Sequence, residues 1–141
     1  MIRFDRLKAT IQRHEGLRLK PYHCPAGKLT IGIGRNLDDK GITIGEANTL
    51  LETDIQECAA DMERIFPAAW DDMDGPRQEA LVNMRFQLGS AGFKRFRRML
   101  KGVKAGDWET AAREALDSAW AKQTPKRAQE VAEVLRTGKW R

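Results

Sequence analysis

The chain has 141 residues, a length that suits one domain with a hydrophobic core. Apolar residues make up 41% and charged residues 32%, which excludes disordered and fibrous classes, and the net charge is +5. No apolar run approaches the roughly 20 residues of a membrane-spanning helix. The charged N-terminal segment also lacks the apolar stretch of a signal peptide, so we expect a chain made in the cytoplasm without one.

The N-terminal part predicts a helix followed by a β-hairpin. Apolar residues at near-helical spacing predict a helix over residues 2–14, and Gly16 should end it. Glu15 would then lie at the helix C-terminus, where the dipole disfavours negative charge, as suits a general acid. Residues 15–42 form the expected hairpin segment. Gly32 and Gly34 alternate with strand-forming residues there, which indicates close approach by a ligand or by the first helix.

The remainder reads as helices. A capping box at Thr43-Ile-Gly-Glu46 opens a linking helix over 43–66, whose apolar stripe includes Cys58 and which Pro67 ends. A helical segment covers 67–141, with one helix opening at Asp74-Gly-Pro76 and closing at Gly89. Helices at about 93–101 and 107–116 follow, and a last helix starts at Thr124-Pro125. We treat residues 1–141 as a single domain.

Cysteines and histidines are too few for a disulfide framework or a metal centre. Cys24 and Cys58 differ in their surroundings and lack metal-ligand spacing, and His14 and His23 do not complete a zinc site with them. We therefore expect two free thiols, no metal and no cofactor.

Basic residues gather near residue 100 and would suit a polyanion such as nucleic acid, an anionic envelope or a membrane surface. We interpret them as a solvated helix face, because apolar residues at helical spacing between them form a core stripe. The basic residues are Lys94, Arg95, Arg97, Arg98, Lys101 and Lys104, and the stripe consists of Phe93, Phe96, Leu100 and Val103.

The spacing of three polar residues in the N-terminal part indicates a possible catalytic site. Eight residues separate Glu15 from Cys24, and five separate Cys24 from Thr30, so a carboxyl, a thiol and a hydroxyl can meet in one cleft. With these residues alone, the interpretation stops at a helical protein with a hairpin and a possible Glu-centred cleft. Five sequence blocks occur in a fixed order around and after these residues: EGLRLKPY at 15–22, LTIGIG at 29–34, ALVNMRFQLG at 80–89, AWAKQTPKRA at 119–128 and LRTGKW at 135–140.

These ordered blocks resemble the phage-type lysozymes of glycoside hydrolase family 24, the T-even phage endolysin type. The resemblance implies an α+β, mostly helical, two-lobed fold with a small N-terminal β-hairpin lobe and a helical C-terminal lobe. The N-terminal helix would pack with the C-terminal lobe. It also implies hydrolysis of the β-1,4 bond from N-acetylmuramic acid to N-acetylglucosamine in peptidoglycan.

The same resemblance assigns the site residues. Glu15 matches the general acid, Cys24 the second catalytic group and Thr30 the water-side hydroxyl. Five further positions match cleft-wall and substrate-binding positions in the helical lobe: Phe86, Gln87, Trp120, Thr124 and Arg127. Core packing is an equally good interpretation of Phe86 and Trp120.

Two departures from the family pattern bear on mechanism and stability. Many members have Asp at the place of Cys24, and many have His at the place of Arg35, which removes a local histidine–carboxylate pair. Glycoside hydrolysis normally uses two carboxyl groups, whereas an ordinary thiol with a pKa of about 8.5 is only about 3% ionised at pH 7. We therefore favour direct water attack with inversion, and leave open whether Cys24 acts as base, as nucleophile or only positions water.

The sequence thus predicts a monomeric phage muramidase that lyses the host wall after holin-dependent release. Three alternatives remain open: a non-catalytic peptidoglycan-binding relic of the fold, a nucleic-acid-binding helical protein, and an enzyme that also disrupts membranes through an amphipathic helix. The nucleic-acid alternative lacks a recognisable reading motif. A lytic transglycosylase would differ from a muramidase in leaving anhydro ends.

Overall fold

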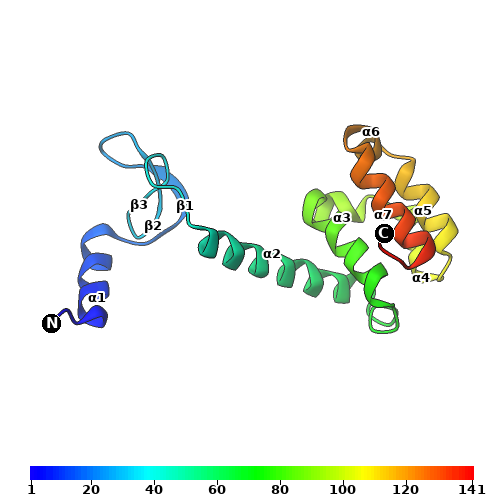
Figure 1. Cartoon of the computed structure of the whole chain (residues 1–141), viewed down its shortest axis with the longest axis horizontal. Coiled ribbons are helices and arrows are strands. Elements are labelled where there is room, and N and C mark those ends of the chain that lie inside the picture. Colours follow the sequence, from blue (N-terminus) through cyan, green and yellow to red (C-terminus); the bar gives the residue numbers. More distant parts are fainter. The chain divides into compact units, whose positions relative to one another are not determined.

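The computed structural model describes the whole chain, Met1 to Arg141. Two compact units are present: the hairpin unit, Met1–Thr49, and the helical unit, Leu50–Arg141. Helix α2 (Ile44–Ile65) begins in the first unit and ends in the second (Figure 1). The chain is mostly helical with one small antiparallel sheet, so the predicted α+β class is confirmed.

The hairpin unit starts with helix α1 (Phe4–Glu15), slightly later than the helix expected over 2–14. Gly16 ends it in a positive-φ conformation, and the Gly16 N–H donates to the Gln12 carbonyl over 2.8 Å. Strands β1 (Arg18–His23), β2 (Leu29–Gly32) and β3 (Arg35–Asn36) follow in the order β1-β2-β3. The expected hairpin is therefore a three-stranded sheet, because the chain turns back once more between Gly32 and Arg35.

Arg35, where many members of the family that the sequence resembles have histidine, forms a two-point ion pair. Its guanidinium nitrogens donate to the two carboxylate oxygens of Glu46 over 2.9 and 2.6 Å, and one of them also reaches the Gly41 carbonyl. Glu46 in turn forms the predicted capping box with Thr43, in which each side chain accepts from the other residue's backbone N–H. Strand β3 is thus tied to the first turn of α2.

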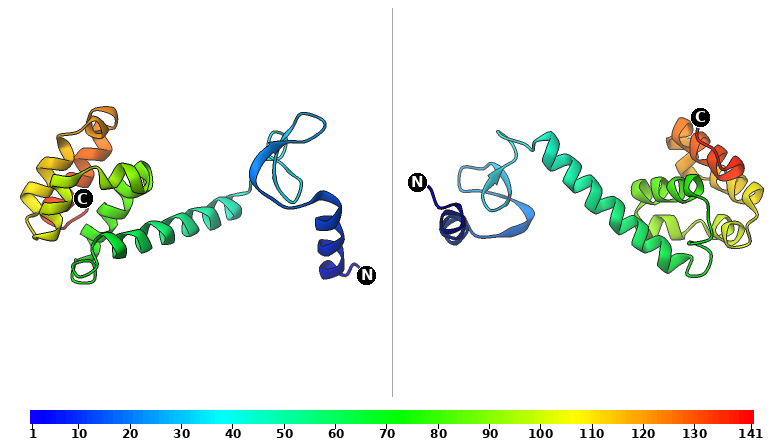
Figure 2. Two further views of the ribbon diagram at one scale, coloured as in Figure 1. Left: turned by 180° about the vertical axis from the view of Figure 1, so that it is seen from behind. Right: turned by 60° about the horizontal axis from the view of Figure 1, so that its bottom comes forward.

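The helical unit contains α3 (Gly75–Lys94), α4 (Arg97–Lys104), α5 (Trp108–Leu116), α6 (Ala119–Gln123) and α7 (Pro125–Thr137). Helix α7 packs against α3, α5 and α6, and α4 packs against α5 (Figure 2). The core is apolar and includes the largest fully buried side chains: Phe66, Phe93, Met62, Leu81, Met84, Met99, Leu135, Val103, Val131 and Val134. None of the helices is long and apolar enough to span a bilayer.

Helix ends differ from the sequence predictions in three places. Gly89 does leave helical geometry, at φ 75° and ψ 168°, but the chain resumes its helix and α3 continues to Lys94. The next helix consequently starts at Arg97 instead of residue 93. Helix α6 was not predicted; Ser118 opens it by accepting a hydrogen bond from the Ala121 N–H.

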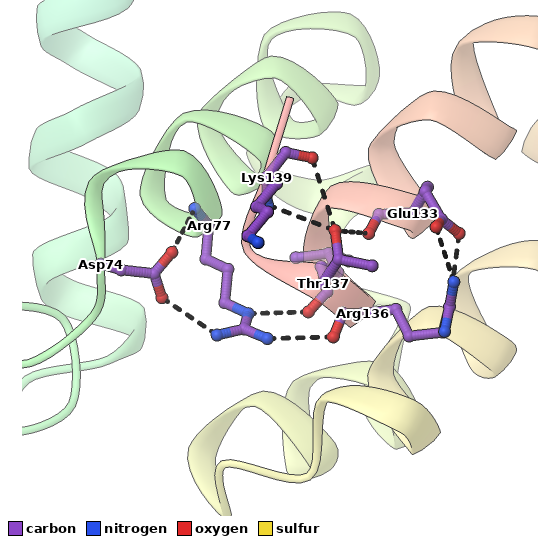
Figure 3. Close-up of polar contacts among 7 residues, drawn as sticks. Asp74, Arg77, Glu133, Arg136, Thr137 and Lys139 are labelled. Atoms are coloured by element: carbon purple, nitrogen blue, oxygen red, sulfur yellow. Dashed lines mark hydrogen bonds and ion pairs between the residues drawn. The ribbon is translucent and has the colours of Figure 1, made fainter. Parts of the chain in front are cut away.

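The C-terminal end of α7 is held to the start of α3 by Arg77 (Figure 3). Its guanidinium donates to the carbonyls of Leu135 and Arg136 over 2.8 and 3.0 Å, and it pairs with Asp74 over 3.2 Å. The same group lies 4.6 Å from the ring centre of Trp108. Because the last carbonyls of a helix lack partners within it, a cation there satisfies and stabilises that end.

The basic residues near residue 100 are all exposed. Phe93, Leu100 and Val103 are buried and Phe96 is half-buried against the core, so the prediction of a core stripe is confirmed. Lys94, Arg95, Arg97, Arg98, Lys101 and Lys104 surround that stripe on the solvent side.

Candidate active site

Glu15 is the last residue of α1, and its side chain lies against the turn between β2 and β3. A Cβ atom placed on Gly34 would lie 2.8 Å from Glu15 Oε2 and 3.1 Å from its Cδ. Gly34 also has a φ of +71°, which residues with a side chain rarely adopt. The close approach predicted from the Gly32–Gly34 alternation is therefore made by the end of the first helix.

Cys24 and Thr30 face one another across the β1–β2 connection. The Cys24 N–H donates to the Lys28 carbonyl over 2.9 Å, and the Gly27 N–H donates to the Cys24 carbonyl over 2.8 Å. Thr30, on β2 opposite Tyr22, is only 3% exposed, and its hydroxyl donates to the Lys28 carbonyl over 2.8 Å. This tight turn fixes the half-buried thiol beside the hydroxyl.

The surroundings of Cys24 favour its ionised form. Hydrogen bonding to the Lys28 backbone, helped by the Ala26 backbone and the Thr30 hydroxyl, outweighs partial burial and lowers the pKa of the thiol. The Cys24 thiol therefore loses its proton more readily than the thiol of an ordinary cysteine. Thr30 has one hydroxyl proton with two acceptors nearby: it donates to the Lys28 carbonyl over 2.8 Å, and by turning to the Cys24 sulfur it stabilises the thiolate.

The three candidate catalytic residues thus come from one small unit. Glu15 can donate a proton when it is neutral, and the Cys24–Thr30 pair can hold a water molecule by accepting or donating hydrogen bonds. Nowhere in the chain do three or more metal-ligating side chains gather closely enough to hold a metal ion. The chemistry available from these side chains is acid–base chemistry and water orientation.

The candidate substrate-binding residues lie in the helical unit and fall into two groups. In the first, the Trp120 indole N–H donates to Gln87 Oε1 over 2.8 Å, and the Thr124 hydroxyl donates to the Trp120 carbonyl over 3.0 Å. Trp120 is only 5% exposed and meets the edge of the Phe96 ring. It is therefore a core residue that fixes Gln87, while direct contact of Trp120 with substrate stays a prediction.

The second group lines a groove of about 610 Å³ on the helical unit. Phe86 is 42% exposed there, although it is a large apolar residue. Arg127 lines the same groove and is fixed by Asn83, which accepts through its side-chain and backbone oxygens over 2.9 and 3.1 Å. The Phe86 ring is therefore not a buried core residue, while its contact with substrate stays a prediction.

Sequence reasoning missed a charged cluster in the helical unit. Asp61 of α2 is 2% exposed and accepts from Arg85 of α3 over 2.8 Å. A carboxylate within the apolar stripe of a helix was the signal that could have revealed it, because such a group needs a buried partner.

Comparison with known proteins places this site in a family. The family model described as phage lysozyme matches residues 12–136. The chain is 35% identical to the pre-baseplate central spike protein Gp5 of Enterobacteria phage T4 over 91% of its own length, but it spans only 27% of that protein. It is 29% identical to probable T4-type lysozyme 2 of Dictyostelium discoideum, covering 94% of each chain.

A third relative points the same way. The endolysin of Acyrthosiphon pisum secondary endosymbiont phage 1 is 31% identical over 83% of this chain and 80% of its own. The match to the family model includes Glu15, Cys24 and Thr30 as well as all five candidate positions of the helical unit. The chain belongs to the phage lysozyme family and is a glycoside hydrolase that acts on peptidoglycan.

Proposed function

We propose that this enzyme is a muramidase that hydrolyses the β-1,4 bond between N-acetylmuramic acid and N-acetylglucosamine, with Glu15 as the general acid. The observation that carries the proposal is the arrangement of the hairpin unit. The Glu15 carboxyl lies directly beside the Gly34 backbone, and the Cys24 thiol lies beside the Thr30 hydroxyl in the same unit. Glycoside hydrolysis normally uses two carboxyl groups. Here Glu15 supplies one, and the Cys24–Thr30 pair takes the place of the second group, which activates water.

Glu15 protonates the glycosidic oxygen as the bond to the leaving sugar breaks. A positioned general acid contributes about 10²–10⁴-fold to the rate. The position of Glu15 supports this role, because it is the last residue of α1 and its carboxyl lies beside Gly34 in the turn between β2 and β3.

Cys24 and Thr30 orient a water molecule that attacks the opposite face of the sugar. The lowered pKa of the Cys24 thiol allows it to take a proton from that water more readily than an ordinary cysteine. A covalent bond from Cys24 to the sugar would leave a thioglycoside, whose sulfur is a poor site for protonation by Glu15. Direct attack by water therefore accounts for these residues better than a covalent intermediate does, and it inverts the configuration.

The first-formed anomer tests this mechanism. Proton NMR recorded during early hydrolysis of a soluble peptidoglycan oligosaccharide should show an α product from the β bond. A first-formed β product, or a glycosyl adduct on Cys24 detected by mass spectrometry, would contradict inversion while leaving muramidase activity intact.

The endolysin relative supports a role in host lysis at the end of infection. We propose that the enzyme acts on the wall as a monomer after leaving the host cytoplasm through holin-made holes. Expression with and without a holin should give rapid lysis only with the holin. Lysis at the same rate without it would contradict this route.

The spike relative supports a second candidate, a lysozyme region of a larger virion protein. Mass spectrometry of purified phage particles distinguishes the two. Peptides of this chain within intact particles favour the virion protein, and their restriction to the lysate favours the endolysin.

The exposed basic residues of the helical unit support contact with anionic envelope material and give no base-reading motif for nucleic acid. Dye leakage from vesicles containing anionic lipids, measured with the Glu15→Gln variant, separates membrane disruption from catalysis. Leakage by this variant would add a membrane activity to the enzyme, and its absence would restrict the enzyme to the wall.

A further inference from the structure

A buried ion pair joins α2 to α3 in the helical unit. Asp61 is 2% exposed and accepts from Arg85 Nε over 2.8 Å, while the Arg85 side chain is itself only 12% exposed. Arg64 reaches the other carboxylate oxygen from the surface over 3.3 Å, and a second nitrogen of Arg85 lies 3.7 Å from Cys58 Sγ. Burying charge is costly even when every charge is paired, so such a pair contributes little to stability and is better understood through what it holds in place.

Arg85, which pairs with Asp61, and Ser90, which lies near the Asp61 carboxylate, are on opposite sides of the break in α3. Arg85 precedes Gly89, where the helix leaves its regular geometry, and Ser90 follows it. Burial alone would raise the pKa of Asp61, but hydrogen bonds from Arg85 and Ser90, together with the positive charges of Arg85 and Lys94, bring it below the usual range. The ionised form of Asp61 is therefore favoured. Its ion pair with Arg85 fixes the flank before the break, and its charge favours a hydrogen bond from Ser90 beyond the break.

The segment between these two contacts contains Phe86 and Gln87. Phe86 is 42% exposed, and Gln87 accepts the indole proton of Trp120 over 2.8 Å. This segment is thus fixed before the break by the bond from Arg85 to Asp61 and by the bond from Trp120 to Gln87, and Ser90 lies near Asp61 after the break. A helix break at glycine is otherwise free to vary, because glycine adopts many backbone conformations at little cost.

We propose that Asp61 is a positioning residue for the substrate-binding segment Phe86–Gln87, acting through Arg85 and Ser90 across the break at Gly89. The proposal rests on the proposed muramidase function and on the assignment of Phe86 and Gln87 to substrate binding that the family resemblance implies. It predicts that loss of the carboxylate weakens substrate binding while leaving the chemical step, which belongs to Glu15, nearly unchanged.

Two variants and one control test this. Asp61→Asn keeps the shape of the side chain but removes its charge, and Ser90→Ala is a milder change that removes only the contact beyond the break. Val131→Ala is the matched control, because Val131 is a 1% exposed core residue of α7 whose truncation lowers stability without touching this cluster.

The first readout needs no activity. The chain has four tryptophans, so its indole N–H resonances are few, and substitution of Trp120 by Phe assigns the one that donates to Gln87. Gln87→Ala, which removes the acceptor, sets the size of the shift. Asp61→Asn and Ser90→Ala should move the Trp120 resonance in the same direction as Gln87→Ala, whereas Val131→Ala should leave it in place.

The second readout is the KM-against-kcat split on soluble peptidoglycan. Asp61→Asn should raise KM about fivefold, the factor that corresponds to one lost hydrogen bond, with kcat within about twofold of wild type. An unmoved Trp120 resonance in both variants, or a fall in kcat with KM unchanged, would overturn the positioning role. Absence of activity in the wild-type enzyme would instead overturn the proposed function, while the resonance still tests whether Asp61 controls Gln87.

Discussion

Replacing Gly34 by alanine should displace the Glu15 carboxyl without unfolding the protein. The added Cβ would lie 2.8 Å from Glu15 Oε2, so the carboxyl oxygen must move by about 0.6 Å to reach the 3.4 Å at which ordinary contact begins. The overlap is with the far end of a flexible side chain, which can turn away at little cost in stability. A misplacement of about 1 Å in a catalytic group can cost about 10²-fold, so we expect Gly34→Ala to lose about 10- to 100-fold in kcat.

Gly32 provides a control with the same backbone strain. Gly32 and Gly34 both have a φ of +71°, yet a Cβ on Gly32 would meet nothing within 4 Å. Alanine in this conformation costs about 1–2 kcal/mol in either place. The two variants should therefore unfold at similar denaturant concentrations, below that of wild type, and only Gly34→Ala should lose activity beyond its loss of folded protein.

Urea unfolding followed by circular dichroism gives the stabilities, and turbidity loss of purified cell walls gives the activities. Equal activity of the two alanine variants would refute the reasoning that the hydrogen atom of Gly34 makes room for the catalytic carboxyl. A much larger stability loss for Gly34→Ala would show that the Glu15 side chain cannot turn away.

Three further results are expected from the hairpin unit and the buried thiol. Cys24→Asp should stay active, and Cys24→Ala should lose most of its rate. Cys24→Ser separates water positioning from base catalysis, because a serine hydroxyl can hold water but is a poor base. If the thiolate is the base, Cys24→Ser should resemble Cys24→Ala, and wild-type activity should rise with pH through a pKa below that of an ordinary thiol. A brief iodoacetamide pulse followed by mass mapping should label the partly exposed Cys24 before Cys58, because Cys58 is 3% exposed and burial raises the pKa of its thiol. Equal labelling of the two cysteines would contradict this difference in exposure. Arg35→Met should lower Tm above about pH 4.5, where the unfolded Glu46 is ionised, and the difference from wild type should vanish as pH falls through about 2, the pKa that pairing with Arg35 gives Glu46. A difference in Tm that stays constant down to pH 2 would show that Arg35 stabilises the unit by packing alone.

The features that local signals determine were predictable from the sequence. Gly16 ends α1 because a glycine tolerates the positive φ of a helix end, and Thr43 with Glu46 opens α2 because their side chains satisfy free backbone groups. The close approach at Gly34 was also visible, because a glycine among strand residues often marks a place where another group comes near the backbone.

Features that depend on pairing with another segment of the chain were not predictable. Strand β3 has only two residues, and it exists because Asn36 and Arg35 pair with Thr30 and Ile31. The ion pair of Asp61 with Arg85 joins residues 24 apart. The carboxylate among the apolar residues of its helix signals that Asp61 needs a buried partner, but no local pattern identifies Arg85 as that partner.

Trp120 shows the same limit at the candidate site. Its family position predicts a role near the glycan, and its burial follows from packing against Phe96, which spacing along the chain does not reveal.

The most direct test of the central claim is digestion of purified peptidoglycan by wild-type enzyme and by Glu15→Gln, with mass and reducing-end analysis of the fragments. Glu15→Gln keeps the shape of the side chain but cannot donate the proton, so it should be at least about 100-fold slower. Wild-type enzyme should release fragments that end in reducing N-acetylmuramic acid. Anhydro ends, reducing N-acetylglucosamine ends, or a Glu15→Gln enzyme within a few-fold of wild type would contradict a Glu15-dependent muramidase.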